Sequence, residues 1–200
     1  DIYTNEGIVG RSYLEPYVIK SMRYLVPALH DLGAMLGGSS LSPIDLFERA
    51  RKSLHFVGYE GLSMIAVSGL DMAIWDALAK AADMPLCVFL GGDLGSVRAY
   101  NSNGLWLKDP QQLGGEAEEL LKEGNFSALK LRLGREKSTE DISAIKILKS
   151  SIGENVDLMV DFNQGLNMAE ALDRCHKIDH LGLYWIEEPI VYDNLEGYAQ

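Results

Sequence analysis

Apolar runs that end in polar side chains recur at regular spacing in the second half of the chain. The transitions fall at Ser102, Arg132, Asp161 and Glu187, which are 30, 29 and 26 residues apart. Helical patterns flank each run, which indicates buried parallel strands joined by helices. Units of this length build a (β/α)8 barrel when about eight of them follow one another. The spacing therefore predicts an α/β fold, with the first four β/α units of a barrel in residues 93–200.

The same pattern gives the expected limits of each element in this half. Strands are expected at Val97–Ser102, Ser127–Leu133, Val156–Phe162 and Leu183–Glu187. Helices are expected at Pro110–Glu123, Thr139–Ile152 and Met168–Ile178.

Residues 1–92 have a different, mostly helical pattern and are expected to form a separate domain. Alternating apolar residues around a Glu6-Gly7 turn predict the tail of a hairpin whose first strand precedes the chain. Three helices follow, at Pro16–Leu32, Ser42–Phe56 and Ser63–Ala82. Ser42 is the expected N-cap of the second helix, with Pro43 in its first turn.

Composition limits the classes of partner. The formal net charge of −11 argues against a nucleic-acid partner, because a phosphate backbone requires a basic surface. The most apolar stretch, Met64–Ala79, contains Ser68, Asp71 and Asp76, so we expect no membrane span. Two cysteines do not indicate a disulfide framework, and a reducing, cytoplasmic location is expected.

Polar side chains converge where the expected strands end. Side chains alternate along a strand, so Lys130 and Arg132 share one face, and Asp161 shares a face with Asn163. Glu187 ends the next strand. Active sites of barrels lie at the carboxyl ends of their strands. These five side chains are therefore expected to meet at one rim.

Two carboxylates at this rim indicate a metal site. Asp161 and Glu187 would repel each other unless a cation lies between them or one is protonated. Mg2+ prefers such hard oxygen ligands and completes its shell with water and substrate. Lys130 and Arg132 beside the metal would attract an anionic substrate, and the pKa of Lys130 should be lowered enough for it to accept a proton. The alternative is that these charges form salt bridges that seal the end of the barrel.

Several motifs together resemble one known family. They are Ala66–Lys80, Met84-Pro85-Leu86, Leu90-Gly91-Gly92, Lys130-x-Arg132, Asp161-x-Asn163-Gln164 and Trp185-Ile186-Glu187-Glu188-Pro189. Their order and spacing are similar to those of the mandelate racemase and muconate lactonizing enzyme family, within the enolase superfamily. The resemblance covers essentially the whole chain and is closer to the mandelate racemase and acid-sugar dehydratase side.

The resemblance implies a partial α+β capping domain before a modified TIM barrel. It implies a lyase, such as an acid-sugar dehydratase, or an isomerase, such as a racemase. In both reactions Mg2+ binds the carboxylate of a hydroxy-acid or sugar acid and stabilises the enediolate formed when the α-proton leaves. Family members are commonly homo-oligomers, so a homo-oligomer is expected here.

The resemblance also implies a role for each site residue. Asp161 and Glu187 match metal ligands, and Asn163 matches a residue that supports the metal site. Lys130 matches a lysine that contacts the substrate carboxylate, and Arg132 stands where the family usually has a lysine base. Two further substrate-binding residues are implied, which are Ser102 and Tyr17.

Two departures from the family pattern change the expectation. A guanidinium stays protonated at physiological pH and is a poor base, so Arg132 disfavours racemisation by two bases and favours elimination of water. The third metal carboxylate and the histidine–aspartate base are expected on strands after Gln200. A metal-binding family member without enolase-type catalysis therefore stays open as an alternative, as does a purely structural barrel fragment.

Overall fold

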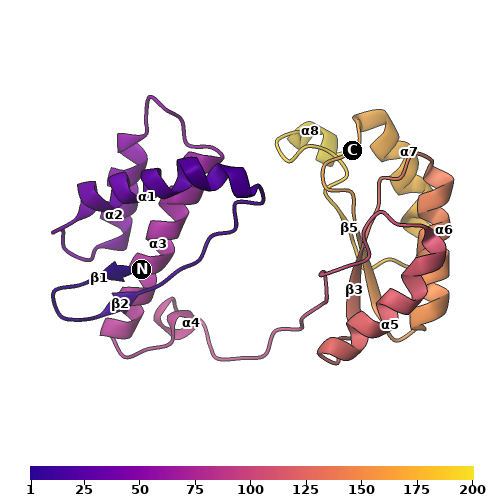
Figure 1. Cartoon of the computed structure of the whole chain (residues 1–200), viewed down its shortest axis with the longest axis horizontal. Helices are drawn as coiled ribbons and strands as arrows, with labels where there is room; N and C mark the ends of the chain where they lie inside the picture. The colour runs from indigo at the N-terminus through magenta and orange to yellow at the C-terminus, as the bar shows by residue number, and fades with distance from the viewer. The chain divides into compact units, whose positions relative to one another are not determined.

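One long apolar helix, α3 (Leu62–Ala81), lies at the centre of the N-terminal unit of the computed structural model, which describes residues 1–200. The chain divides into two units, Asp1–Ser96 and Val97–Gln200 (Figure 1). The other elements of the first unit are β1 (Ile2–Tyr3), β2 (Val9–Gly10), the 3-10 helix η1 (Ile19–Ser21), α1 (Met22–Leu36), α2 (Pro43–Ser53) and α4 (Leu86–Phe89).

The core of the first unit is formed where α1 and α2 pack on α3. Leu25, Leu46 and Val67 are buried in this cluster, one from each helix. By length and composition alone, α3 is apolar enough to cross a membrane. The core helix of a globular unit meets the same two criteria, and Ala66 and Ile74 of α3 are also buried in the cluster.

The expected turn at Glu6-Gly7 is present, because β1 pairs with β2 in antiparallel register, Ile2 opposite Gly10. A strand before Asp1 stays a prediction. The expected start of the first helix is wrong. The first helix begins at Met22 and not at Pro16, because Tyr17 has a φ of 47°, which a right-handed helix does not allow. Ser42 does precede α2, but its side chain makes no capping hydrogen bond.

A three-stranded parallel sheet forms the centre of the second unit, with strand order β3-β4-β5. Its strands are β3 (Ala128–Arg132), β4 (Asp157–Asp161) and β5 (Ile186–Glu187). The other elements are the 3-10 helices η2 (Pro110–Gln112) and η3 (Asp179–Leu181) and the helices α5 (Leu113–Glu123), α6 (Ser138–Ile152), α7 (Met168–Ile178) and α8 (Leu195–Tyr198). Figure 1 shows α5, α6 and α7 on one side of this sheet.

Leucine side chains on the helix-covered face fix the register of the sheet. Leu129 and Leu131 of β3 and Val160 of β4 are fully buried in the same apolar cluster as Ile145 and Leu148 of α6. A shift of one residue would turn these side chains to the other face, so the apolar pattern specifies the pairing. The same pairing sends the intervening polar side chains to the opposite face.

The first expected strand, Val97–Ser102, is wrong except at one residue. Asn101 forms a single parallel bridge to Leu129, and it exchanges backbone hydrogen bonds with Ala128 and Lys130 at 3.0 and 3.1 Å. Val97 is 93% exposed, because the ladder does not extend to it. The fourth strand is shorter than expected, although the Val160 amide still donates to the carbonyl of Trp185 at 3.1 Å.

A buried ion cluster fastens the loop that follows β3. The carboxylate of Asp141, at the start of α6, accepts hydrogen bonds from the Gly134 and Arg135 amides at 3.2 Å. It also pairs with the guanidinium groups of Arg135 and Arg174 at 3.2 and 2.8 Å, and all three side chains are at most 10% exposed. Arg135 in turn donates to the carbonyl oxygen of Arg132 at 3.2 Å. The cluster therefore holds the chain immediately after Arg132.

Gly10→Ala should destabilise the first unit, because an added Cβ would lie 2.0 Å from the carbonyl oxygen of Ala73 on α3. We expect a loss of about 1–3 kcal/mol in the free energy of unfolding, measured by urea denaturation. Gly33→Ala is the matched control. That site in α1 has no atom within 4 Å of the new methyl group, and the change should stabilise by about 0.5–1 kcal/mol. Equal effects of the two variants would contradict the close packing at Gly10.

Asp141→Ala should leave two buried guanidinium groups without their shared carboxylate. We expect it to cost about 3–5 kcal/mol of unfolding free energy, measured by chemical denaturation. Asp173→Ala removes an exposed carboxylate that pairs with Lys177 on α7, and it should cost at most about 1 kcal/mol. A loss for Asp141→Ala no larger than that of the control would show that the cluster does not stabilise the loop.

Candidate active site

Three charged side chains form one row across the sheet. Arg132 pairs with Asp161, and Asp161 pairs with Glu187, as register partners on β3, β4 and β5. Register partners in a parallel sheet project to the same face, and each of these residues ends its strand. The expected convergence of Lys130, Arg132, Asp161 and Glu187 is therefore present in the structure.

Lys130 joins the two carboxylates. Its Nζ lies 3.0 Å from Asp161 Oδ2 and 2.9 Å from Glu187 Oε1. The side chains of Lys130 and Asp161 are 8% and 2% exposed, whereas that of Glu187 is 32% exposed. The ammonium therefore neutralises two carboxylates that would otherwise repel each other.

The predicted lowering of the Lys130 pKa assumes a metal ion beside the lysine and stays a prediction, whereas the residues of this chain act in the opposite direction. Burial disfavours the charged ammonium, and the nearby charge of Arg132 acts in the same direction. Hydrogen bonds and charge from Glu187 and Asp161 outweigh both effects, so the pKa of Lys130 lies above its ordinary value. With these two partners Lys130 is a cationic hydrogen-bond donor.

Arg132 is held among three groups. Its Nη2 donates to Ser102 Oγ at 3.3 Å, and its Nη1 lies 3.2 Å from Asp161 Oδ2. The guanidinium carbon lies 5.1 Å from the ring centroid of Trp106. The predicted substrate-binding residue Ser102 is therefore brought to this site.

Asn163 orients the Asp161 carboxylate. Its backbone amide donates to Asp161 Oδ1 at 2.7 Å, and its side-chain Nδ2 donates to Oδ2 at 3.1 Å. Asn163 and Gln164 both have positive φ, 47° and 61°, so the chain turns sharply after β4. This turn brings the amide back to the carboxylate, which agrees with a supporting role for Asn163.

Two aromatic residues at this site were not predicted as functional. The Trp185 Nε1 donates to Glu187 Oε2 at 3.0 Å, and the rings of Tyr100 and Trp185 meet edge to face at 5.3 Å. The Lys130 Nζ lies 5.8 Å from the Tyr100 ring centroid. Strand alternation places Trp185 on the face of Glu187, two residues away, so the sequence does contain a signal for this residue. The sequence contains no comparable signal for Tyr100.

Tyr17 is the other residue that was predicted to bind substrate. It belongs to the first unit, where its side chain is 95% exposed. A substrate-binding role for Tyr17 stays a prediction.

The donor set fits part of a Mg2+ site. Asp161 and Glu187 supply two carboxylates at register-paired positions, and Asn163 holds one of them in place. The chain brings together no group of three His, Cys, Asp or Glu side chains around one point. Mg2+ commonly takes one or two carboxylates and fills its other positions with water and substrate oxygens. The two acids therefore suit Mg2+ in kind, without forming a complete site.

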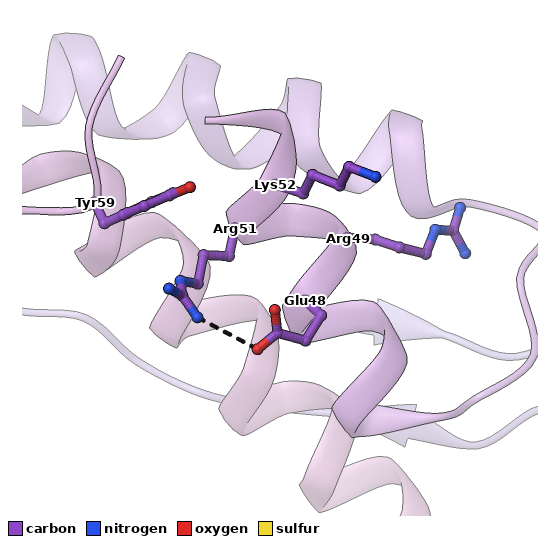
Figure 2. A pocket seen from close by; sticks show the side chains of 5 residues that line it. All are labelled: Glu48, Arg49, Arg51, Lys52 and Tyr59. Carbon is purple, nitrogen blue, oxygen red and sulfur yellow. Dashed lines mark hydrogen bonds and ion pairs between the residues drawn. The ribbon is translucent and has the colours of Figure 1, made fainter. Parts of the chain in front are cut away.

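A separate surface hollow of about 280 Å³ lies on the first unit (Figure 2). It is lined by Glu48, Arg49, Arg51, Lys52 and Tyr59. Arg51 pairs with Glu48 at 3.5 Å and lies 4.9 Å from the Tyr59 ring centroid, so its charge is already partnered. None of the predicted site residues lines this hollow.

Known proteins match the chain along nearly its whole length. Residues 1–91 match the family described as mandelate racemase / muconate lactonizing enzyme, N-terminal domain. Residues 112–200 match the enolase C-terminal domain-like family. The first part of the chain thus matches an N-terminal domain, and the second part matches the C-terminal domain of the same enzyme superfamily.

Three individual relatives agree with this match. An enolase from alpha proteobacterium BAL199, crystallised with Mg, is 61% identical with a TM-score of 0.95, over 100% of this chain and 56% of its own. A Bradyrhizobium enolase crystallised with magnesium and mandelic acid is 37% identical with a TM-score of 0.91. The match covers 100% of this chain and 55% of that enolase. The L-talarate/galactarate dehydratase of Salmonella typhimurium is 34% identical over 72% of this chain and 36% of its own length.

The chain therefore spans about half the length of the solved relatives, and about a third of the Salmonella enzyme. Over that span, the family matches cover both of its units, and the motifs at Lys130, Asp161 and Glu187 occur in the order that the resemblance requires. This chain belongs to the mandelate racemase / muconate lactonizing enzyme family of the enolase superfamily.

Proposed function

We propose that this chain supplies the metal-binding and carboxylate-binding part of an enzyme that removes the proton α to a carboxylate. The substrate class is a hydroxy-acid or a sugar acid, and the cofactor is Mg2+. The observation that carries the proposal is the row of Arg132, Asp161 and Glu187 with Lys130 between the two acids. Relatives crystallised with magnesium support the choice of metal.

Each side chain has one task in this proposal. Asp161 and Glu187 hold the metal, and Asn163 keeps the Asp161 carboxylate oriented. Lys130 and Arg132 present cationic donors to the substrate carboxylate, together with the hydroxyl group of Ser102. A bound divalent cation would supply the positive charge that makes an α-proton acidic enough to leave. Tyr17 would contact the substrate from the capping domain.

Arg132 directs the proposal toward a lyase. It occupies the position at which the family usually has a lysine base, and a guanidinium does not accept a proton at physiological pH. A single base elsewhere in the protein suits elimination of water better than racemisation by two bases. The dehydratase activity of the Salmonella relative supports this choice.

The proposal extends to the architecture and setting of the protein. Residues 1–92 would form part of an α+β capping domain, and residues 93–200 would form the first four units of a modified (β/α) barrel. The whole protein would act as a cytoplasmic homo-oligomer, without a nucleic-acid or membrane partner.

The arginine at position 132, where the family usually has a lysine base, also favours a second candidate function. A family member without a base would bind Mg2+ and a small carboxylate but would not catalyse enolase-type chemistry. Calorimetry distinguishes the two, because this candidate predicts Mg2+ binding by the whole protein without turnover of any hydroxy-acid.

The proposed function predicts Mg2+-dependent turnover when the whole protein is assayed against a panel of hydroxy-acids and sugar acids. Asp161→Asn removes one metal-binding charge and should lower turnover on the order of 100-fold, with weaker Mg2+ binding by calorimetry. Asp173→Asn, an exposed carboxylate on α7, is the control and should leave both unchanged. Turnover that persists with a chelator, or in Asp161→Asn at the wild-type rate, would refute the proposal.

The absence of a base at Arg132 predicts a stereochemical result. In deuterium oxide, substrate recovered after partial turnover should carry deuterium in a single configuration, because protons are exchanged on one face only. Nuclear magnetic resonance of the recovered acid measures this label. Deuterium in both enantiomers would show that two bases operate, and the protein would then be a racemase.

A further inference from the structure

Trp106 contacts Arg132 but is not buried. Its indole ring lies over the guanidinium of Arg132, with 5.1 Å between the guanidinium carbon and the ring centroid. The residue is nevertheless 53% exposed, so it contributes little to the core. Neither core packing nor the proposed roles of the site residues account for an exposed tryptophan at the polar rim of the sheet.

The loop on the N-terminal side of Trp106 is firmly anchored. Leu105 is completely buried, although its φ of 55° is a strained conformation for leucine. The Arg132 amide donates to the Leu105 carbonyl at 3.0 Å, and the Leu105 amide donates to Glu116 Oε1 at 3.3 Å. The residue before Trp106 is thus fixed to the strand that carries Arg132.

The loop on the C-terminal side is anchored as well. Lys108 pairs with both carboxylate oxygens of Glu116 at 3.0 Å, and its carbonyl accepts hydrogen bonds from Arg135 at 3.1 and 3.2 Å. Its amide donates to the Trp106 carbonyl at 2.7 Å. Contacts on both sides, which share the Glu116 carboxylate, therefore present the ring of Trp106 to Arg132.

Arg132 itself has unused hydrogen-bonding capacity. The residue is 9% exposed, and neither its Nε nor its Nη1 has a hydrogen-bond partner. Nη1 lies within ion-pair distance of Asp161, 3.2 Å, but outside hydrogen-bonding geometry. Buried donors without partners are destabilising, so they indicate that an oxygen atom is received there.

We propose that Trp106 is a positioning residue that acts through Arg132. The ring covers one face of the guanidinium, excludes water from it, and holds Nε and Nη1 free for an anionic oxygen of the substrate. A guanidinium in such a site of low polarity attracts an anion more strongly than one in water. This inference rests on the proposed function, since it assumes a carboxylate-bearing substrate.

Binding experiments on the whole protein with MgCl2 test the inference, with galactarate and mandelate as probes and calorimetry as the measurement. For the probe that binds more tightly, Trp106→Ala should weaken binding about tenfold or more, and Trp106→Phe should retain binding within about threefold because phenylalanine keeps a ring. Leu107→Ala is the matched control, since Leu107 lies next to Trp106 and is 56% exposed. It should leave binding unchanged. Equal binding by Trp106→Ala and wild type would overturn the inference.

A double-mutant cycle separates an effect through Arg132 from a direct or merely structural one. In an Arg132→Met background, adding Trp106→Ala should change binding by less than twofold. A further loss as large as that seen in the wild-type background would overturn the positioning role. Failure of the proposed function looks different, because wild type itself would then bind neither probe in a Mg2+-dependent way, and the inference would fall with it.

Discussion

Four charges at the ends of neighbouring strands, three of them buried, govern the rest of this structure. Lys130 and Arg132 supply two positive charges, and Asp161 and Glu187 supply two negative ones. An unpaired charge in such a position would be strongly destabilising, whereas each of these has an opposite charge within 3.2 Å. The cluster is therefore neutral as a whole, and its members cannot be changed one at a time without consequence.

The geometry of the cluster depends on packing on the other side of the sheet. Leu129 and Leu131 are buried in the apolar cluster between the sheet and its helices, and this burial sets the register that aligns Arg132 with Asp161. A slip by one residue would place charges in the apolar layer and leucines at the rim. Apolar packing thus specifies the position of the chemical groups, and the Asp141 cluster then fixes the loop that follows them.

The sequence predicts the elements whose patterns are local. Strands β3 and β4 and helix α7 lie within one residue of their expected limits, because their apolar periodicity reflects one continuous buried face. The strand expected at Val97–Ser102 has the right composition, but a strand exists only where a neighbour pairs with it, and only Asn101 has such a partner. The start of α1 was misplaced because the backbone of Tyr17 adopts a positive φ that periodicity does not reveal.

The candidate site likewise contains residues that local sequence patterns predict and residues that they do not. The sequence predicts that four side chains meet, which are Asp161, Glu187, Lys130 and Arg132. Its apolar pattern shows which residues of a strand share a face and where each strand ends. The ring of Trp106 reaches Arg132 only through a left-handed turn at Leu105, and no local pattern predicts that turn.

The charge of the cluster links metal binding to substrate binding under the proposed function. With its own four charges the rim is neutral, so it offers an anion little net attraction. A divalent cation held by the two acids would leave the rim with an excess of two positive charges, and Arg132 already keeps two donors free. Substrate carboxylate and metal should therefore strengthen each other's binding, because each supplies the charge that the other lacks.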